Sequence, residues 1–142
     1  MKENKNVLDE LNKGATMGMD AIHFVLDKVE DEEFKKTLEL EHNKYKDISR
    51  RANDLYKNYS DDEPHETNTM NKIMTWYGVQ MKTMTDNSNS KIAELLLQGT
   101  NMGIIEGRKL LNNKEMDKDI KDLLNDFVTM QEDSVEKLKT FL

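Results

Sequence analysis

The chain has 142 residues, a size suited to one domain, residues 1–142, with a single core. It contains no cysteine, which excludes disulfides, thiolate metal sites and cysteine nucleophiles. It also has no run of about 18 apolar residues that could span a membrane. The net charge is −7 with acids and bases interspersed, so we expect no nucleic-acid partner, which would need concentrated positive charge. The first residues lack the apolar core of a signal peptide, and a cytoplasmic location is expected.

Long helices are favoured because the chain has one proline and only six glycines. Apolar residues at three- and four-residue spacing predict five helical segments. The first covers about residues 5–29, and the second follows Asp31, a predicted N-cap. So few residues separate these two helices that they should form an antiparallel hairpin.

A polar stretch at residues 60–63 separates the second helix from the third, which is expected to begin near Pro64. Another polar run at 86–90 ends it. The fourth helix covers roughly residues 90–111, and the fifth starts near Met116 after a turn. The apolar stripe of the third helix consists of Met70, Ile73, Met74, Tyr77, Met81 and Met84.

The third helix suggests how the others are connected. At 1.5 Å per residue, its ~20 residues would extend ~30 Å, enough to return the chain along the length of a bundle. The fold class predicted is therefore all-α, a ferritin-like four-helix bundle with an additional crossover helix between its two hairpins. A plain five-helix array is the alternative.

Glycines recur at four-residue spacing in two helices, as Gly14 and Gly18 and as Gly99, Gly103 and Gly107. Glycine within a helix costs up to about 1 kcal/mol relative to alanine, so a packing reason is expected. In the crossover arrangement helices one and four are antiparallel, and Gly18 should lie against Gly99, with Gly14 against Gly103. Alternatively, the glycines make room for methionine side chains.

The fourth helix has two apolar stripes. The first, with Ile92, Leu95, Gly99, Met102 and Leu110, is expected to enter the bundle. The second needs a cover, either the methionine-rich third helix or a second copy of the chain. A homo-oligomer through this surface is therefore a possible arrangement. The second stripe consists of Ala93, Leu97, Ile104 and Leu111.

Two acid–histidine pairs, Asp20 with His23 and Glu39 with His42, have the spacing of a metal motif. At about 100° per residue, however, Asp20 and Glu39 point away from the apolar faces, and the two histidines lie on the flanks. The four side chains should not converge on one ion. His65, in a polar segment, is expected to be exposed.

Polar residues on the core faces are Glu41, Glu106, Gln131 and Ser134. A buried carboxylate must be paired, protonated or bound to metal. Glu41 and Gln131 should lie at similar heights, and Glu106 several turns away. The favoured interpretation is a structural carboxylate hydrogen-bonded to Gln, Ser, Tyr or Lys. An iron or manganese site using Glu41, His42, Glu106 and Gln131 is the alternative.

Through its helix lengths and crossover, the whole chain resembles the ferritin-like superfamily, which includes ferritins and rubrerythrins. The resemblance implies that Glu41 corresponds to the second-helix metal glutamate and that Gln131 and Ser134 occupy the place of a last-helix ligand motif. The sequence departs from the pattern: Lys44 stands in place of one histidine and Ser134 in place of another. No acid is expected on the inward face of helix one.

The segments MGMDAIHFVLDKV and SKIAELLLQGTNMGIIEG resemble small uncharacterised ferritin-like proteins of anaerobic, spore-forming bacteria, a resemblance that implies no known activity. The favoured function is a non-enzymatic structural or interaction module without an intact di-metal site, and no catalytic residue or cofactor is predicted. The alternatives are a di-iron or di-manganese redox protein using Glu41, and a small-molecule binder beside the methionine-rich helix.

Overall fold

The computed structural model describes residues 2–59, 64 and 68–142, and the side chains of residues 68–71 are not part of that description. The predictions for residues 60–63 and for His65 therefore lie outside the described residues. Within them the chain is all-helical, without strands, so the predicted all-α class is confirmed. None of the described helices is long and apolar enough to cross a membrane. The helices are α1 (Asn4–Leu26), α2 (Glu32–Tyr56), α3 (Asn68–Thr83), α4 (Asn89–Asn113) and α5 (Lys118–Lys139).

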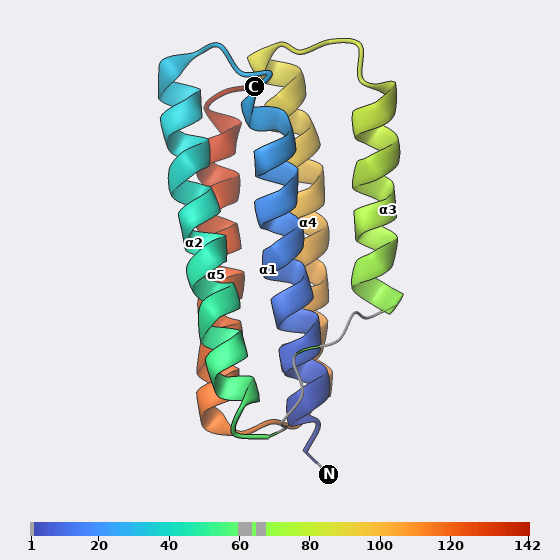
Figure 1. Ribbon diagram of the computed structural model, residues 1–142, viewed down its shortest axis with the longest axis vertical. Helices are drawn as coiled ribbons and strands as arrows, with labels where there is room; N and C mark the ends of the chain where they lie inside the picture. The colour runs from blue at the N-terminus through green and yellow to red at the C-terminus, as the bar shows by residue number, and fades with distance from the viewer. Residues whose placement is uncertain (1, 60–63, 65–67) are drawn as a thin grey trace.

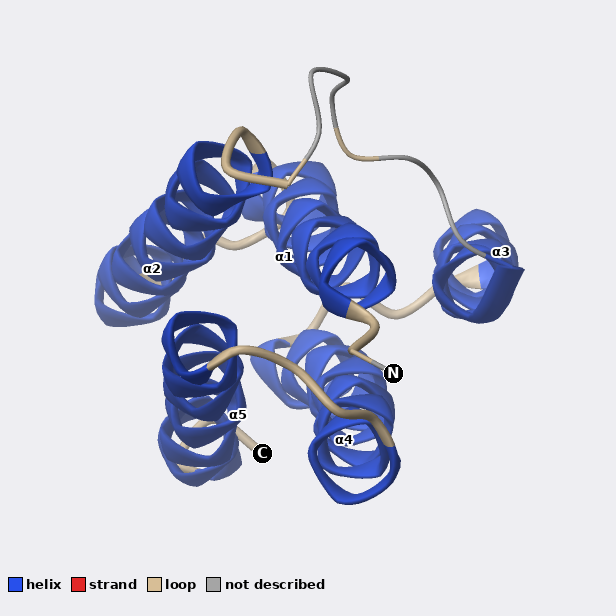
Figure 2. Cartoon of the chain, turned by 90° about the horizontal axis from the view of Figure 1, so that it is seen from below, coloured by secondary structure: helices blue, strands red, loops and turns tan. Residues whose placement is uncertain are grey.

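The helices form two antiparallel hairpins, α1 with α2 and α4 with α5 (Figure 1). Seen end-on, these four helices occupy the corners of a bundle, and α3 lies outside it, next to α1 and α4 (Figure 2). α3 runs the same way as α1 and brings the chain back to the end of the bundle where α4 begins. It starts at Asn68, later than the predicted start near Pro64.

Side-chain caps fix the starts of two helices. The Asp31 carboxylate accepts a hydrogen bond of 2.8 Å from the backbone N–H of Phe34, so this predicted N-cap is confirmed. The Ser88 hydroxyl accepts one of 3.2 Å from the N–H of Lys91 at the start of α4. Each cap satisfies one of the N–H groups that a helix leaves without an internal partner.

The core of the bundle consists of the apolar stripes of α1, α2, α4 and α5. Its aromatic side chains pack in pairs: the rings of Phe34 and Phe141 are stacked at 4.3 Å, and those of Tyr45 and Phe127 meet edge-to-face at 6.3 Å. α3 contributes a smaller cluster, in which Ile73 packs against Met17 of α1 and Met102 of α4.

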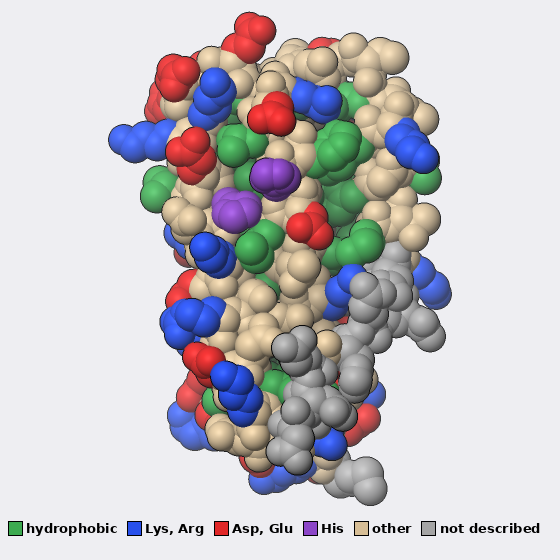
Figure 3. Space-filling model, viewed as in Figure 1, with side chains coloured by type: hydrophobic (Ala, Val, Ile, Leu, Met, Phe, Trp, Pro, Cys, Tyr) green, Lys and Arg blue, Asp and Glu red, His purple; other side chains and the backbone are tan. Residues whose placement is uncertain are grey.

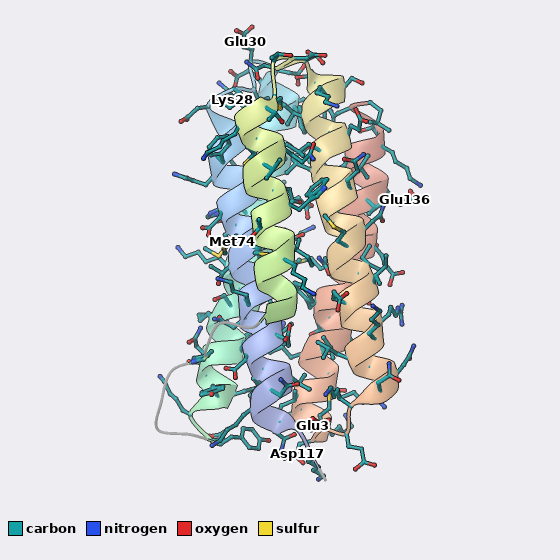
Figure 4. The ribbon with its side chains drawn as sticks, turned by 90° about the vertical axis from the view of Figure 1, so that its right-hand side faces the viewer. Glu3, Lys28, Glu30, Met74, Asp117 and Glu136 are labelled. Carbon is teal, nitrogen blue, oxygen red and sulfur yellow. The ribbon has the colours of Figure 1, made fainter. Side chains whose placement is uncertain are left out.

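The end of the bundle that holds the N-terminus is closed by contacts between the amino-terminal residues and the α4–α5 connection. The N–H of Glu3 donates to the carbonyl of Glu115 at 2.7 Å, and the N–H of Asp117 donates to the Asn4 side chain at 2.9 Å. The Tyr59 hydroxyl, just after α2, donates to the Asp117 carboxylate at 2.7 Å. Figure 4 shows Glu3 and Asp117 together at this end.

The glycines do not form the predicted α1–α4 contact, and this prediction is wrong. A Cβ atom at Gly18 would lie 2.6 Å from the ring of Tyr45 on α2, and one at Gly99 would lie 1.6 Å from the hydroxyl of Tyr77 on α3. One at Gly103 would meet the Gln131 amide at 2.2 Å. Each glycine therefore makes room for a large side chain of a neighbouring helix, which is close to the alternative reading, although the side chains are not methionines.

The two stripes of α4 are also partly exchanged. Gly99 and Met102, which were expected to face the bundle, are the residues that α3 contacts. Ala93, assigned to the outer stripe, is fully buried, and Leu97 packs against the main core. At about 100° per residue the two stripes are centred about 150° apart, so α4 is buried on two sides, and the spacing alone does not say which side faces α3.

Candidate functional site

The carboxylate of Glu41 lies inside the bundle with its side chain 1% exposed. It sits on the core face of α2 between Leu38 and Tyr45, so the amphipathic stripe that buries those residues also buries the acid. Gln131 and Ser134, from α5, are 3% and 2% exposed. The predicted burial of all three polar side chains is confirmed.

Two lysines hold one oxygen of this carboxylate. Oε1 of Glu41 lies 3.4 Å from Nζ of Lys44, one turn further along α2, and 3.4 Å from Nζ of Lys137 on α5. Both lysine side chains are nearly half exposed, so their stems extend inward from the surface while the ammonium groups retain access to water. Glu41 thus joins α2 to α5 as a buried ion pair, in agreement with the favoured structural interpretation.

A neutral tyrosine continues the polar centre. The phenol of Tyr45, one turn after Glu41, is buried next to the side chains of Gln131 and Thr100. Burial, which disfavours the phenolate, raises the pKa of Tyr45 to about 12. Thr100 in turn donates to the carbonyl of Leu96 at 2.7 Å. The tyrosine links α2, α4 and α5, and it places Gln131 near the height of Glu41, as predicted.

Tyr77 of α3 reaches this centre from outside the bundle. Its hydroxyl end occupies the space above Gly99, where the missing side chain lets the ring pass α4. Burial, together with the nearby Tyr45, raises the pKa of Tyr77 well above its ordinary value. Trp76 packs edge-to-face on the same ring at 5.3 Å. Tyr77 packs against the main core, and Trp76 is half-buried beside it.

A cavity of about 10 Å³ lies between these side chains and has room for about one water molecule. It is lined in part by Gly18, Glu41, Tyr45, Thr100 and Ser134. Among the described residues, Oε2 of Glu41 and Oε1 of Gln131 have no hydrogen-bond partner. An unpartnered buried oxygen costs about 1–3 kcal/mol, so a water molecule bridging to Oε2 in this cavity would be favourable.

The residues of this centre do not fit a two-metal site. Such a site in a helical bundle uses four carboxylates and two histidines, whereas Glu41 is the one carboxylate that lines the cavity. Two ammonium groups stand against Glu41 and would repel a cation. Within the part of the chain that the structure describes, no group of three or more His, Asp or Glu side chains is placed to hold a metal.

The other acids and histidines considered as metal ligands are exposed or half-buried, whereas the Glu41 carboxylate is fully buried. The prediction that Glu106 lies on the core face is wrong. Its side chain is 24% exposed and pairs with Lys109 at 3.5 Å. Asp20 and Glu39 are exposed, as their helical phase predicts. His42 is half-buried and His23 is exposed, on the flank of the α1–α2 hairpin.

Several residues of the site were missed by sequence reasoning. Lys137 lies one turn after Ser134, but this spacing does not say which residue of another helix its long side chain reaches. Nothing in the sequence around Thr100, apart from its four-residue spacing from Leu96, could have identified it as a residue of this site. On α1, Glu10 and Lys13 are 8% and 7% exposed, which corrects the expectation of no buried acid on that helix.

An apolar groove of about 180 Å³ runs between α1 and α3 on the outer side of the bundle. Asp20 is its one charged lining residue. Phe24, at one edge, is 46% exposed, and Figure 3 shows hydrophobic side chains gathered between α1 and α3. Figure 4 shows Met74 on α3, alongside α1. The other apolar lining residues are Met17, Ala21, Met74, Tyr77, Gly78 and Met81.

Comparison with protein-family models, with curated proteins and with solved structures gives no match to this chain. The fold and the site therefore define the protein by class alone: an all-helical bundle with a buried ion-paired centre and an external helix beside an apolar groove.

Proposed function

We propose that this chain is a ferritin-like helical bundle that works as a non-enzymatic interaction module, and that it self-associates through the groove between α1 and α3. The ferritin-like assignment is supported by the order of the elements, two antiparallel hairpins separated by a helix that runs along the outside of the bundle.

The non-enzymatic role is supported by how the polar centre is used. Glu41, the buried acid that could have served a metal, is held by Lys44 and Lys137, and the Tyr45 hydroxyl is buried beside Gln131 and Thr100. These contacts tie α2, α4 and α5 together. The cavity beside them holds no more than about one water molecule, too little for a substrate.

The single observation that carries the interaction role is the groove. Solvent-exposed apolar side chains that cluster around a concave surface mark interaction sites. Here Phe24 projects beside the groove, and Val79 on the outer face of α3 is 54% exposed. Nothing lies within 4 Å of a Cβ atom placed at Gly78, so another surface can approach the α3 backbone closely.

A second copy of the chain is the occupant that this surface fits. A two-fold dimer brings the same patch of both subunits together, so the patch must contain both a projection and a recess. Phe24 provides the projection, and the space between Met74 and Gly78 provides the recess a short distance away. In such a dimer each Phe24 would enter the groove of its partner.

Sedimentation equilibrium over a range of protein concentrations tests this function. We expect a monomer–dimer equilibrium for the wild type, and Gly78→Glu should raise the dissociation constant at least about tenfold, a change of about 1.4 kcal/mol, by placing a charge in the contact. Asn125→Glu is the matched control, since it adds the same charge at an exposed position of α5 outside the groove lining. A wild type that stays monomeric up to about 1 mM, where association is worth only about 4 kcal/mol, would contradict the proposal.

A further inference from the structure

The rim of the α1–α2 hairpin, here meaning Asn12 on α1 with Ser49 and Asn53 on α2, shows which residues of the two helices meet. Oδ1 of Asn12 accepts hydrogen bonds from Oγ of Ser49 at 2.8 Å and from Nδ2 of Asn53 at 3.0 Å. Because all three side chains are half-buried, the contact lies at the edge of the helix interface, where it borders solvent.

His23 and His42 occupy positions equivalent to Asn12 and Asn53, but nearer the α1–α2 connection. His23 follows Asn12 by eleven residues, and His42 precedes Asn53 by eleven residues. Eleven residues are close to three turns of an α-helix, so each histidine faces nearly the same direction as its asparagine. Since α1 and α2 are antiparallel, both steps lead toward the α1–α2 connection, and His23 and His42 should face each other as Asn12 and Asn53 do.

The surface view agrees with this register. Figure 3 shows two histidine side chains next to each other on the face that α1 and α2 form. His23 is exposed and His42 is half-buried, so both imidazoles can be reached from solvent. An ion could approach the pair without opening the bundle.

The surrounding charges favour a cation. Asp20 and Glu39 are exposed, and each precedes one of the histidines by three residues, a spacing that makes them neighbours on the helix surface. Lys46, four residues after His42, opposes them with one positive charge. Asp27, four residues after His23, is a third exposed acid, so three acids against one base leave a local negative charge beside the imidazoles.

From this geometry we propose that His23 and His42 together bind one divalent transition-metal cation of the Ni²⁺, Cu²⁺ or Zn²⁺ class, with water completing the coordination. Neutral imidazole is a common ligand for these ions, whereas Mg²⁺ and Ca²⁺ require oxygen ligands. The pair needs neither Asp20 nor Glu39 as a ligand, so the outward direction of those acids does not prevent it. The site joins α1 to α2 and borders the α1–α3 groove, whose lining includes Asp20 and Phe24 of α1.

Isothermal titration calorimetry of the untagged protein with NiCl₂ tests the site. We expect one Ni²⁺ per chain, and His23→Gln and His42→Gln should each weaken binding at least about tenfold, because the loss of a ligand should cost no less than the loss of a residue that supports one. His65→Gln is the matched control and should retain the wild-type affinity. Mg²⁺ should give no binding.

The double variant sharpens the test. If the two imidazoles share one ion, the loss of binding free energy in His23→Gln/His42→Gln should be smaller than the sum of the losses in the two single variants, because either single variant already removes the chelating pair. Wild-type affinity in a single variant, an equal loss in His65→Gln, or no Ni²⁺ binding at all would each overturn the proposal. Gly78→Glu should leave Ni²⁺ binding unchanged, so a failure of this site is distinguishable from a failure of self-association.

Discussion

The four-helix core and the external helix α3 differ in how they are held. In the core, Phe34, Leu124 and Phe127 are at most 1% exposed, and the polar side chains of Glu41 and Tyr45 are tied to neighbouring helices. α3 is attached mainly through Ile73 and Tyr77 and leaves Val79 half exposed.

This difference suggests that the four-helix core provides the stability of the protein and that α3 provides its interaction surface. Residues surrounded by neighbours on all sides provide most of the free energy of folding, whereas a helix packed on one side has a low local stability. Low local stability and exposed apolar surface are what a binding surface needs. On this view the buried polar centre holds the bundle together, and α3 and its groove are available for a partner.

The largest expected effect comes from the core. Phe127→Ala should lower the free energy of unfolding by about 3–5 kcal/mol, because it removes a fully buried ring that packs against Tyr45. Ile73→Ala on α3 should lower it by about 2 kcal/mol, the low end for a buried isoleucine, since Ile73 belongs to the smaller cluster with Met17 and Met102. Urea denaturation measures both. Equal losses would show that α3 is an integral part of the core.

The next effect is a pH dependence that comes from Tyr45. Burial raises its pKa in the folded state from the ordinary 10.0 to about 12, so the folded protein keeps a proton that the unfolded chain loses above pH 10. This contribution to stability is complete below pH 10 and is lost as the pH rises to 12, roughly 2–3 kcal/mol in all.

Urea titrations between pH 8 and about pH 11.5 measure this dependence. Tyr45→Phe should show a clearly smaller alkaline fall than the wild type, although Tyr77, whose pKa is also raised, will still contribute. An unchanged alkaline fall would mean that the phenol of Tyr45 is not buried in solution.

A smaller effect tests how α3 is attached. Gly99→Ala places a Cβ atom within 1.9 Å of two atoms of Tyr77, so the ring must withdraw, and the expected loss is about 1–3 kcal/mol. Gly78→Ala, in open space on α3, should instead stabilise by up to about 1 kcal/mol. Hydrogen exchange should then be faster in α3 for Gly99→Ala, with α2 and α5 little changed. Effects of the same sign in both variants would contradict this attachment.

Much of the fold follows from periodicity. The spacing of apolar residues predicts the five helices, and the Asp31 cap and the burial of Glu41, Gln131 and Ser134 follow from helical phase alone. These features depend on residues close together in the chain. A stripe that is apolar over five turns must face a neighbour, whatever that neighbour is.

The errors concern which neighbour each face meets. Four-residue spacing identifies the glycines as packing positions but does not say that Gly18 meets Tyr45 and Gly99 meets Tyr77. Glu106 shares the stripe of Gly99 and Met102, which faces α3 and not the bundle, so Glu106 is partly exposed and pairs with Lys109. The reach of Lys137 to Glu41 depends on a long flexible side chain of another helix, which no spacing rule describes.

The most direct test of the account is the free energy of unfolding of Glu41→Leu, measured with and without iron(II) or manganese(II) in the absence of air. If the buried Glu41 centre is structural, this variant should be within about 1 kcal/mol of the wild type or more stable, because an apolar side chain can replace a buried ion pair without loss. Lys44 and Lys137 can turn to water. Neither metal should stabilise the wild type more than the variant. A wild type that is stabilised by either metal, with two ions per chain that Glu41→Leu fails to retain, would contradict the account and place the protein among the di-metal redox proteins.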